Sequence, residues 1–481
     1  MEPEHLKFGG GLTESAIHPL VAVYLLIAVV LILALPREKA IMPFLVAYFT
    51  IPIQNVVVMG GFHFTALRIV ILVGLARMVF LPGPSSKARF APRFNGVDWA
   101  VLLWSVSAAI AFCLLWMEKQ AYIRSIGDLL DMLGGYLVVR FLIPDGEALR
   151  RTIKVFAAIC VINGACMINE KINHFNVFGL VGGLSSEATR AGQIRAGGVM
   201  GCLYAGALAG VLIPLFIWLW MEGRSRMAAF AGFAGATAMM ITSHSSTSWM
   251  AYGASLLGLA FWPLRKKMSL VRWALLTILV GLHLSMKAPV WALIQRIDLT
   301  GSSSGNQRYR LVDMTIRHFS DWWLIGTKDY NTWGWMSWDT VNQFVDVALT
   351  GGLLPLIFYI LIFKRSFSAI GRARKVVEGK REQELLLWCL GSCLFATVVT
   401  HFGINYMAQL IMGFFPLVVC VTVAAFEATQ GTIHDVKASA HEKFASTPGV
   451  AGLYQPPSSA TQVPRHGHSS RGRKLTRHLV S

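Results

Sequence analysis

The hydrophobic positions of this chain gather into long continuous runs, and the polar positions fall into the segments between them. The runs are close to the ~20 residues that a helix needs to cross the roughly 30 Å hydrocarbon layer of a bilayer. The pattern predicts an all-α, polytopic integral membrane helix bundle with about 13 spans. The expected spans cover residues 17–36, 40–59, 62–82, 97–116, 121–143, 153–170, 197–220, 227–243, 247–263, 270–287, 341–363, 385–402 and 404–427.

Alternate connections between these runs carry the basic residues. Arg37 and Lys39 follow the first run, Arg150 and Arg151 stand in a later connection, and the richest connection is 364–381. In membrane proteins the loops that are rich in Lys and Arg face the cytoplasm. We therefore expect a multi-pass protein with its amino terminus outside and its carboxyl terminus in the cytoplasm.

The remaining connections must then face outward, and the long ones are 171–196 and 288–340. The longer loop is polar, carries Arg and Trp, and stands between apolar runs, so it is a candidate for function rather than a mere connector. The predicted domains are a transmembrane bundle over 1–430, including both outer loops, and a basic cytoplasmic tail over 431–481. The tail lacks apolar periodicity, and we expect disorder there; binding to anionic headgroups is the alternative.

The composition agrees with a membrane protein. Of the 481 residues, 55% are hydrophobic and only 14% are charged, with a mean hydropathy of +0.55. Soluble domains carry about 25% charged residues. The net charge of +18 stands mainly in the alternate connections, which is typical of cytoplasmic loops, so no nucleic-acid partner is expected. The 7 cysteines lie in apolar segments, which predicts buried free thiols.

Three ionisable residues stand inside the fifth predicted span. Arg124, Asp128 and Asp131 are spaced i, i+4 and i+7, so they share one face of a helix. Ionisable groups within a span are costly and normally face a bundle interior or a water-filled cavity. Two interpretations stay open, an internal ion pair that locks the bundle and a lining for a substrate cavity.

The outer loop 171–196 brings two arginines to the mouth of the seventh predicted span. Arg195 directly precedes the expected helix, and Arg190 stands shortly before it. The N–H groups and positive dipole end of a helix amino terminus attract anions. The arginines beside it predict a site for a phosphate or diphosphate, and the alternative is an interfacial pair solvated by lipid headgroups.

The other candidates lie in the outer turn 243–247 and in the long loop. His244 stands in the Ser-rich turn and is either a surface residue or a base. The long loop adds many polar side chains and several tryptophans, which are Trp322, Trp323, Trp333, Trp335 and Trp338. These tryptophans predict either an interfacial belt or platforms that stack against sugar rings.

The layout resembles the O-antigen ligase and O-antigen polymerase superfamily of bacterial envelope glycan enzymes. The family shows an Arg, an acidic residue and a Gly in a late outer loop, and Arg308, Asp321 and Gly326 hold those places here. A later His-Asn pair of the family is matched by Asn342 alone, because Val341 stands where the His is expected.

Other parts of the resemblance lie around that loop. The pair Gly351-Gly352 matches a Gly-rich start of the next span, and Arg195 before Gly197-Gly198 matches an upstream Arg. The Ser-rich turn 243–247 also has a counterpart. The likeness covers roughly residues 150–425.

The resemblance implies a metal-independent glycosyltransferase of the bacterial inner membrane that needs no cofactor. It would polymerise or ligate glycan on the extracytoplasmic face, as in O-antigen or exopolysaccharide biosynthesis. The implied partners are a polyprenyl-diphosphate-linked glycan donor, an acceptor glycan or lipid, and membrane lipids. The alternatives are a flippase or transporter of lipid-linked oligosaccharide and a non-catalytic membrane component of polysaccharide export.

For that reaction, cationic side chains would stabilise the leaving diphosphate. With Val341 in place of the family's His, Asp339 is the first candidate base and His318 the second, and His244 is a further substitute. The predicted catalytic residues are Asp339, His318 and Arg308. The predicted substrate-binding residues are Arg190, Arg195, Arg310, His244, Asn342, Arg124 and Asp128.

Overall fold

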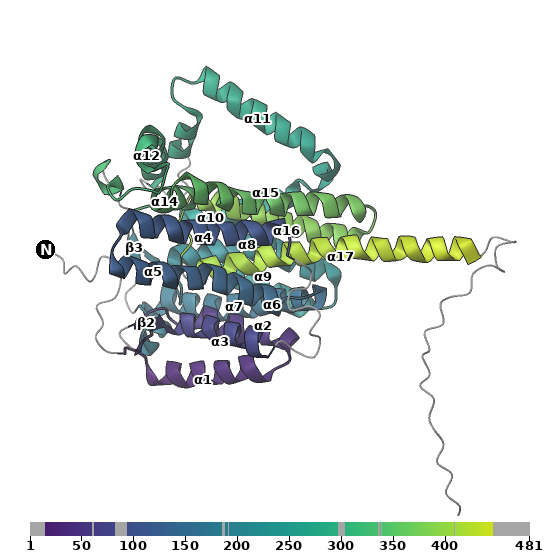
Figure 1. Cartoon of the computed structure of the whole chain (residues 1–481), viewed down its shortest axis with the longest axis horizontal. Coiled ribbons are helices and arrows are strands. Elements are labelled where there is room, and N and C mark those ends of the chain that lie inside the picture. Colours follow the sequence, from purple (N-terminus) through teal and green to yellow (C-terminus); the bar gives the residue numbers. More distant parts are fainter. Residues whose placement is uncertain are drawn as a thin grey trace, which may run out of the picture. The chain divides into compact units, whose positions relative to one another are not determined.

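The structure is a computed structural model that describes residues 15–59, 62–81, 94–184, 188–190, 192–296, 304–334, 337, 339–407 and 409–445. The chain divides into two compact units, residues 1–430 and 431–481. The first unit is an all-α bundle (Figure 1). Where we expected disorder from Gly431 onward, the backbone stays helical to Ala445; residues 446–481 lie outside the described residues.

The α-helices follow one another in the order α1 (Pro19–Ala34), α2 (Arg37–Thr50), α3 (Ala66–Phe80), α4 (Gly96–Trp116), α5 (Lys119–Leu129), α6 (Gly135–Leu142), α7 (Gly146–Asn173), α8 (Cys202–Glu222), α9 (Arg226–Ser243), α10 (Ser246–Ala260), α11 (Met268–Ser285), α12 (Ser304–Arg317), α13 (Phe319–Trp322), α14 (Gln343–Gly351), α15 (Leu353–Val376), α16 (Arg381–His401) and α17 (Gln409–Ala445). A π-helix, η2 (Leu130–Gly134), joins α5 to α6. The 3-10 helices are η3 (Val177–Val181), η4 (Trp262–Lys267), η5 (Val290–Arg296) and η6 (Tyr330–Thr332).

Within the described ranges, 7 helices are long and apolar enough to cross a membrane. They lie at Gly96–Trp116, Gly146–Asn173, Cys202–Glu222, Trp262–Ser285, Leu353–Val376, Arg381–His401 and Gln409–Gln430. Helices overlap every predicted span, but several of them are shorter than a bilayer crossing needs. The chain is therefore an all-α protein with 7 candidate membrane spans among its described residues, and the larger count stays a prediction.

Two predicted spans need correction. The segment expected to span over 40–59 ends its helix at Thr50, and strands β1 (Val56–Met59) and β2 (Phe62–Thr65) then pair as an antiparallel hairpin. Its β-branched valines favour the extended backbone. The span expected over 341–363 starts only at Leu353, because α14 is a separate short helix that ends at Gly351 and is followed by Gly352, whose φ is +83°.

The connections that were predicted to face outward meet at one end of the bundle, here called the polar end. It is formed by the β1–β2 hairpin, η3, the hairpin of β3 (Ala188–Arg190) and β4 (Gln193–Arg195), the turn 243–247 and the connection 402–407. Backbone contacts join these segments, such as Ala196 N–H to Thr242 O at 3.1 Å. Figure 1 shows β2, β3, α12 and α14 at this same end.

The basic connections meet at the opposite end, here called the basic end. Arg37 donates to Phe141 O at 2.8 Å, which joins the start of α2 to α6. Arg265 pairs with Glu384 at 3.0 Å, which joins η4 to α16. Loops that the charge pattern assigned to one side therefore lie together in space, and the side of a membrane that each end faces stays a prediction.

The helices differ sharply in burial. The apolar windows of α8 and α17 are 83% and 94% buried, so these helices form the centre of the bundle. Helix α11 has no buried residue, and Figure 1 shows it standing apart from the bundle. An apolar helix of this kind is stable only against lipid or a partner, which agrees with a membrane protein.

A backbone-to-backbone contact requires two glycines, Gly326 in the long loop and Gly352 just before α15. Gly326 has φ +89°, and a Cβ there would lie 2.3 Å from Leu349 O. Gly352 has φ +83°, and its Cβ would lie 2.7 Å from Leu324 O. Thr327 N–H donates to Leu349 O at 2.8 Å across the same contact. These glycines dock the loop against the segment that leads into α15.

We expect Gly326→Ala to lower the free energy of unfolding by more than about 2 kcal/mol, because left-handed strain and a clash with Leu349 add together. The thermal melting of the purified protein in detergent measures this. Gly379→Ala is the matched control, since Gly379 has φ +91° with nothing within 4 Å of its Cβ position. Equal melting temperatures for the two variants would contradict the proposed close contact.

Candidate functional site

A buried guanidinium group marks the centre of the polar end. Arg308 in α12 is only 5% exposed. Its Nη2 donates to Thr247 Oγ1 at 3.0 Å and to Gly403 O at 3.4 Å. Thr247 lies in the first turn of α10, and Gly403 lies between α16 and α17. Arg308 therefore joins the long loop to two separate places in the bundle.

The Ser-rich turn between α9 and α10 supplies the surroundings of Arg308. Ser243 Oγ donates to Ser248 Oγ at 2.9 Å and is satisfied within the turn. Ser245 Oγ is buried and has no hydrogen-bond partner among the described residues. His244 has φ +42°, which turns the chain, and its side chain is exposed. The turn thus contains one buried hydroxyl group, Ser245 Oγ, that is free to bind a ligand, whereas the side chain of His244 faces solvent.

Arg195 stands beside this turn, at the end of β4. The next residue, Ala196, donates its N–H to Thr242 O at 3.1 Å, which ties the hairpin to the end of α9. The Nε atom of Arg195 is buried and lacks a partner within the described part of the chain. The backbone of Arg190 lies in β3, and its side chain lies outside what the structure describes.

The predicted position of Arg195 directly before a helix is wrong. Helix α8 begins at Cys202, so Arg195 does not directly precede it. The intervening N–H groups of Gly197 and Gly198 already bind a carboxylate of the protein itself, Glu170, at 3.1 and 2.9 Å. Glu170 is 2% exposed and lies near the end of α7. These two backbone N–H groups are therefore occupied by the protein itself, and the side chain of Arg195 stays a candidate for binding an anion.

Asp339 lies next to the helix that carries Arg308. Gln307 Nε2 donates to Asp339 Oδ2 at 3.2 Å. Since Gln307 and Arg308 are neighbours in α12, the carboxylate and the buried guanidinium belong to one region. Asn342 has a structural task instead: its Oδ1 caps α14 by accepting from Phe344 N and Val345 N. The cap explains Asn342 without a substrate.

His318 is engaged with aromatic and acidic partners away from Arg308. Its ring stacks on Trp333, with centroids 4.4 Å apart and an interplanar angle of 8°. Its Nδ1 lies 3.0 Å from Asp321 Oδ2. The hydrogen bonds from His318 and Ser320 hold the pKa of Asp321 below its usual range. These contacts assign His318 to the support of Trp333.

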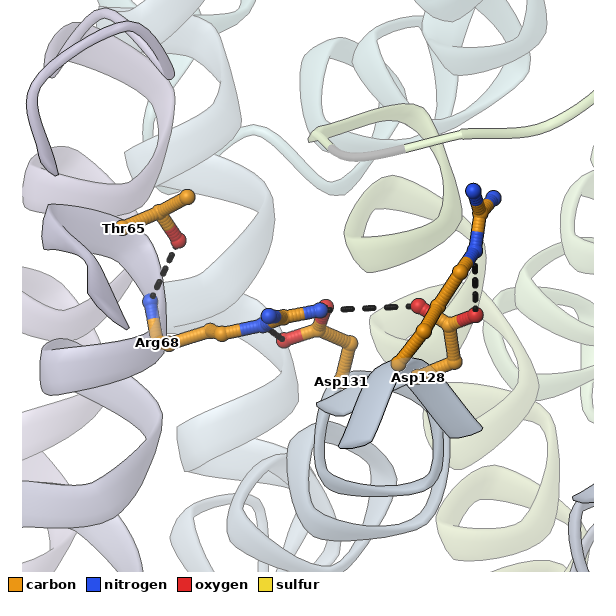
Figure 2. Close-up of polar contacts among 5 residues, drawn as sticks. Thr65, Arg68, Asp128 and Asp131 are labelled. Carbon is orange, nitrogen blue, oxygen red and sulfur yellow. Dashed lines mark hydrogen bonds and ion pairs between the residues drawn. The ribbon is translucent and has the colours of Figure 1, made fainter. Parts of the chain in front are cut away.

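A second polar cluster joins two helices that the pattern had left separate (Figure 2). Arg68, in the first turn of α3, donates from Nη2 to Asp131 Oδ2 at 2.8 Å and reaches Asp128 Oδ1 at 3.5 Å. Arg124 pairs with Asp128 at 3.4 Å, as the i, i+4 spacing indicated. Thr65 Oγ1 caps the turn by accepting from Arg68 N at 3.2 Å. Both arginines and both aspartates therefore carry charged partners.

Asp346 extends this cluster toward the long loop. It lies in the first turn of α14 and accepts a hydrogen bond from Thr340 Oγ1 at 2.7 Å. Loss of water raises the pKa of Asp346 to about 6, while Thr340 and the charge of Arg124 lower it and Asp128 raises it. Such a carboxyl can accept a proton near neutral pH. Asp346, one of the polar side chains that follow the long loop in the sequence, is thus a further candidate base.

Comparison with protein-family models and with curated proteins finds no match for this chain. The structure gathers Arg195, the turn 243–247, Arg308 and Asp339 at the polar end through a series of contacts. It leaves Arg310 exposed on α12.

We expect Arg68→Met and Asp131→Leu each to lower the free energy of unfolding by roughly 1–3 kcal/mol, because Arg68→Met removes the cation beside Asp131 and Asp131→Leu leaves Arg68 with only the more distant Asp128 in a partly buried site. The double variant should lose less than the two single losses added together. Thermal melting in detergent measures all three, with exposed Lys375→Met as the control. Strict additivity would show that the pair does not interact.

Proposed function

We propose that this chain is a membrane glycosyltransferase that polymerises or ligates glycan from a polyprenyl-diphosphate-linked donor onto an acceptor glycan or lipid. The observation that carries the proposal is a set of cationic and hydroxyl groups with spare capacity at the polar end. Arg195 Nε and Ser245 Oγ are buried without partners among the described residues. The hydrogen bonds Ala196 N–H to Thr242 O and Arg308 Nη2 to Thr247 Oγ1 link both groups to the buried Arg308 through the turn 243–247. Unused buried donors of this kind suit a phosphate ligand.

The proposed reaction needs few groups. The acceptor hydroxyl oxygen attacks the anomeric carbon of the donor sugar, and the bond from that carbon to the diphosphate oxygen breaks. Its electron pair leaves with the diphosphate, whose negative charge Arg195 and Arg308 stabilise without a metal. The hydroxyl proton passes to Asp339, with Asp346 as the second candidate base.

The proposed setting is the bacterial inner membrane, with about 13 spans, the polar end outside and the basic end in the cytoplasm. The separation of the two sets of connections onto opposite ends supports this topology. Donors linked to a polyprenyl chain reach such an end from within the bilayer. The charged tail from Gly431 onward then lies on the cytoplasmic side.

We expect Arg308→Ala and Arg195→Ala each to reduce polymer or conjugate formation by about 100-fold, because each removes a cation that stabilises the leaving group. The measurement is gel analysis of extracted glycan from cells that carry only the variant gene. Exposed Arg226→Ala at the basic end is the matched control. Wild-type product levels with normally inserted Arg308→Ala and Arg195→Ala proteins would rule out the diphosphate site.

Cysteine labelling tests the orientation. A membrane-impermeant maleimide should label Asp329→Cys in intact cells, because the exposed Asp329 belongs to the long outer loop. Glu382→Cys, exposed at the basic end, should react only after the cells are opened. Wild-type protein corrects for its 7 native thiols. The reverse labelling pattern would invert the topology.

One observation favours a second function, transport of a lipid-linked oligosaccharide. The π-helix η2 interrupts the fifth predicted span at the position where Asp131 meets Arg68. Broken helices with charged residues are typical of transporters. Proteoliposomes that contain only the lipid-linked donor separate the two functions, since a transporter moves the donor across the bilayer without an acceptor and a transferase does not.

A further inference from the structure

A cavity of about 110 Å³ lies between α12 and residues of the segments 330–334 and 337, apart from the groups around Arg308. One wall is a single face of α12, formed by Gln307, Arg310 and Met314 at i, i+3 and i+7. Tyr330 and Trp333 form the opposite wall. The cavity therefore combines an amide, a guanidinium group and two aromatic rings.

Trp333 is fixed in place by its neighbours. His318 stacks on its ring at a centroid distance of 4.4 Å, and Asp321 holds His318 by a 3.0 Å hydrogen bond. The other described tryptophans of the loop serve differently. Trp322 is buried and donates from Nε1 to Thr315 O at 2.8 Å. An aromatic ring held by a second ring is a rigid surface for a ligand.

Arg310 supplies the charge of the cavity. Throughout the described ranges of the chain it makes no ion pair with a carboxylate, in contrast to Arg317 at the end of the same helix, which pairs with Asp313 at 2.7 Å. An unpaired guanidinium group beside a cavity favours an anionic ligand, and its planar fork matches a carboxylate. Gln307 also contacts Asp339, so the cavity lies one side chain from the proposed base.

We propose that this cavity binds one acidic sugar residue, a hexuronic acid, of the acceptor glycan. Trp333 packs against the apolar C–H face of the pyranose ring, Arg310 binds its carboxylate, and Gln307 and Tyr330 bind hydroxyl groups. The role as acceptor subsite rests on the proposed function; the binding of the sugar does not. The ring on Trp333 would present the glycan end toward Asp339.

The test is direct binding to the purified full-length protein in detergent. The probes are the disaccharide of glucuronic acid β-1,4-linked to glucose and its neutral counterpart cellobiose, which differ by one carboxylate. Ligand-observed NMR titration gives the dissociation constants. We expect the acidic probe to bind about tenfold more tightly than cellobiose, which is the contribution of one charge-assisted contact.

Single variants assign the contacts. Arg310→Gln should remove the preference for the acidic probe, and because Arg310 is exposed this change leaves folding intact. Trp333→Ala should abolish binding of both probes. Trp323→Ala is the matched control, because that ring is 46% exposed and does not line the cavity. A preference that survives in Arg310→Gln, or a wild-type protein that binds neither probe, would overturn the proposal.

Arg195→Ala separates this inference from the proposed function, because Arg195 lies in β4 and does not line the cavity. It should leave probe binding unchanged while glycan formation is lost. Binding of the acidic probe by a protein with no transferase activity would refute the function and keep the cavity. Transferase activity in a protein that binds neither probe would refute the cavity alone.

Discussion

The burial of one positive charge organises the polar end of this protein. A guanidinium group removed from water costs several kcal/mol unless it finds acceptors. Arg308 finds them in Thr247 Oγ1 and Gly403 O, and Thr247 donates onward to Gly403 O at 3.3 Å. The long loop cannot leave the bundle without exposing those acceptors, so α12 and the groups that it carries keep a defined position.

The charged side chains have different partners at the two ends of the bundle and in its interior. At the basic end, ion pairs such as Arg265–Glu384 and Arg150–Glu222 join helices that are distant in sequence. In the interior, Arg140 and Asp98 are fully buried and pair at 3.1 Å, which is a purely structural arrangement. At the polar end, buried donors of Arg195 and Ser245 lack partners among the described residues. This difference, rather than the number of charges, separates a candidate site from the scaffold.

The cavity beside α12 and the cluster around Arg308 lie on different faces of the same helix. Gln307 lines the cavity and contacts Asp339, and Arg308 faces the turn 243–247. One short amphipathic helix therefore divides its polar residues between two surroundings. Helix α12 thus connects the three proposed sites: the acceptor subsite at Trp333, the base Asp339 and the diphosphate site beside Thr247. No group from the basic end takes part in them.

The amino-acid sequence by itself determined the all-α class, the apolar segments, and which connections share an end, because hydrophobic length and charge alternation are local properties. It also indicated the Arg124–Asp128 pair, whose spacing lies within one helix. Arg68 as the partner of Asp131 and Glu170 as the occupant of the Gly197–Gly198 turn were decided only by the tertiary structure. Each depends on which segments meet in space, and hydrogen-bond partners far apart in sequence leave no periodic signal in the chain.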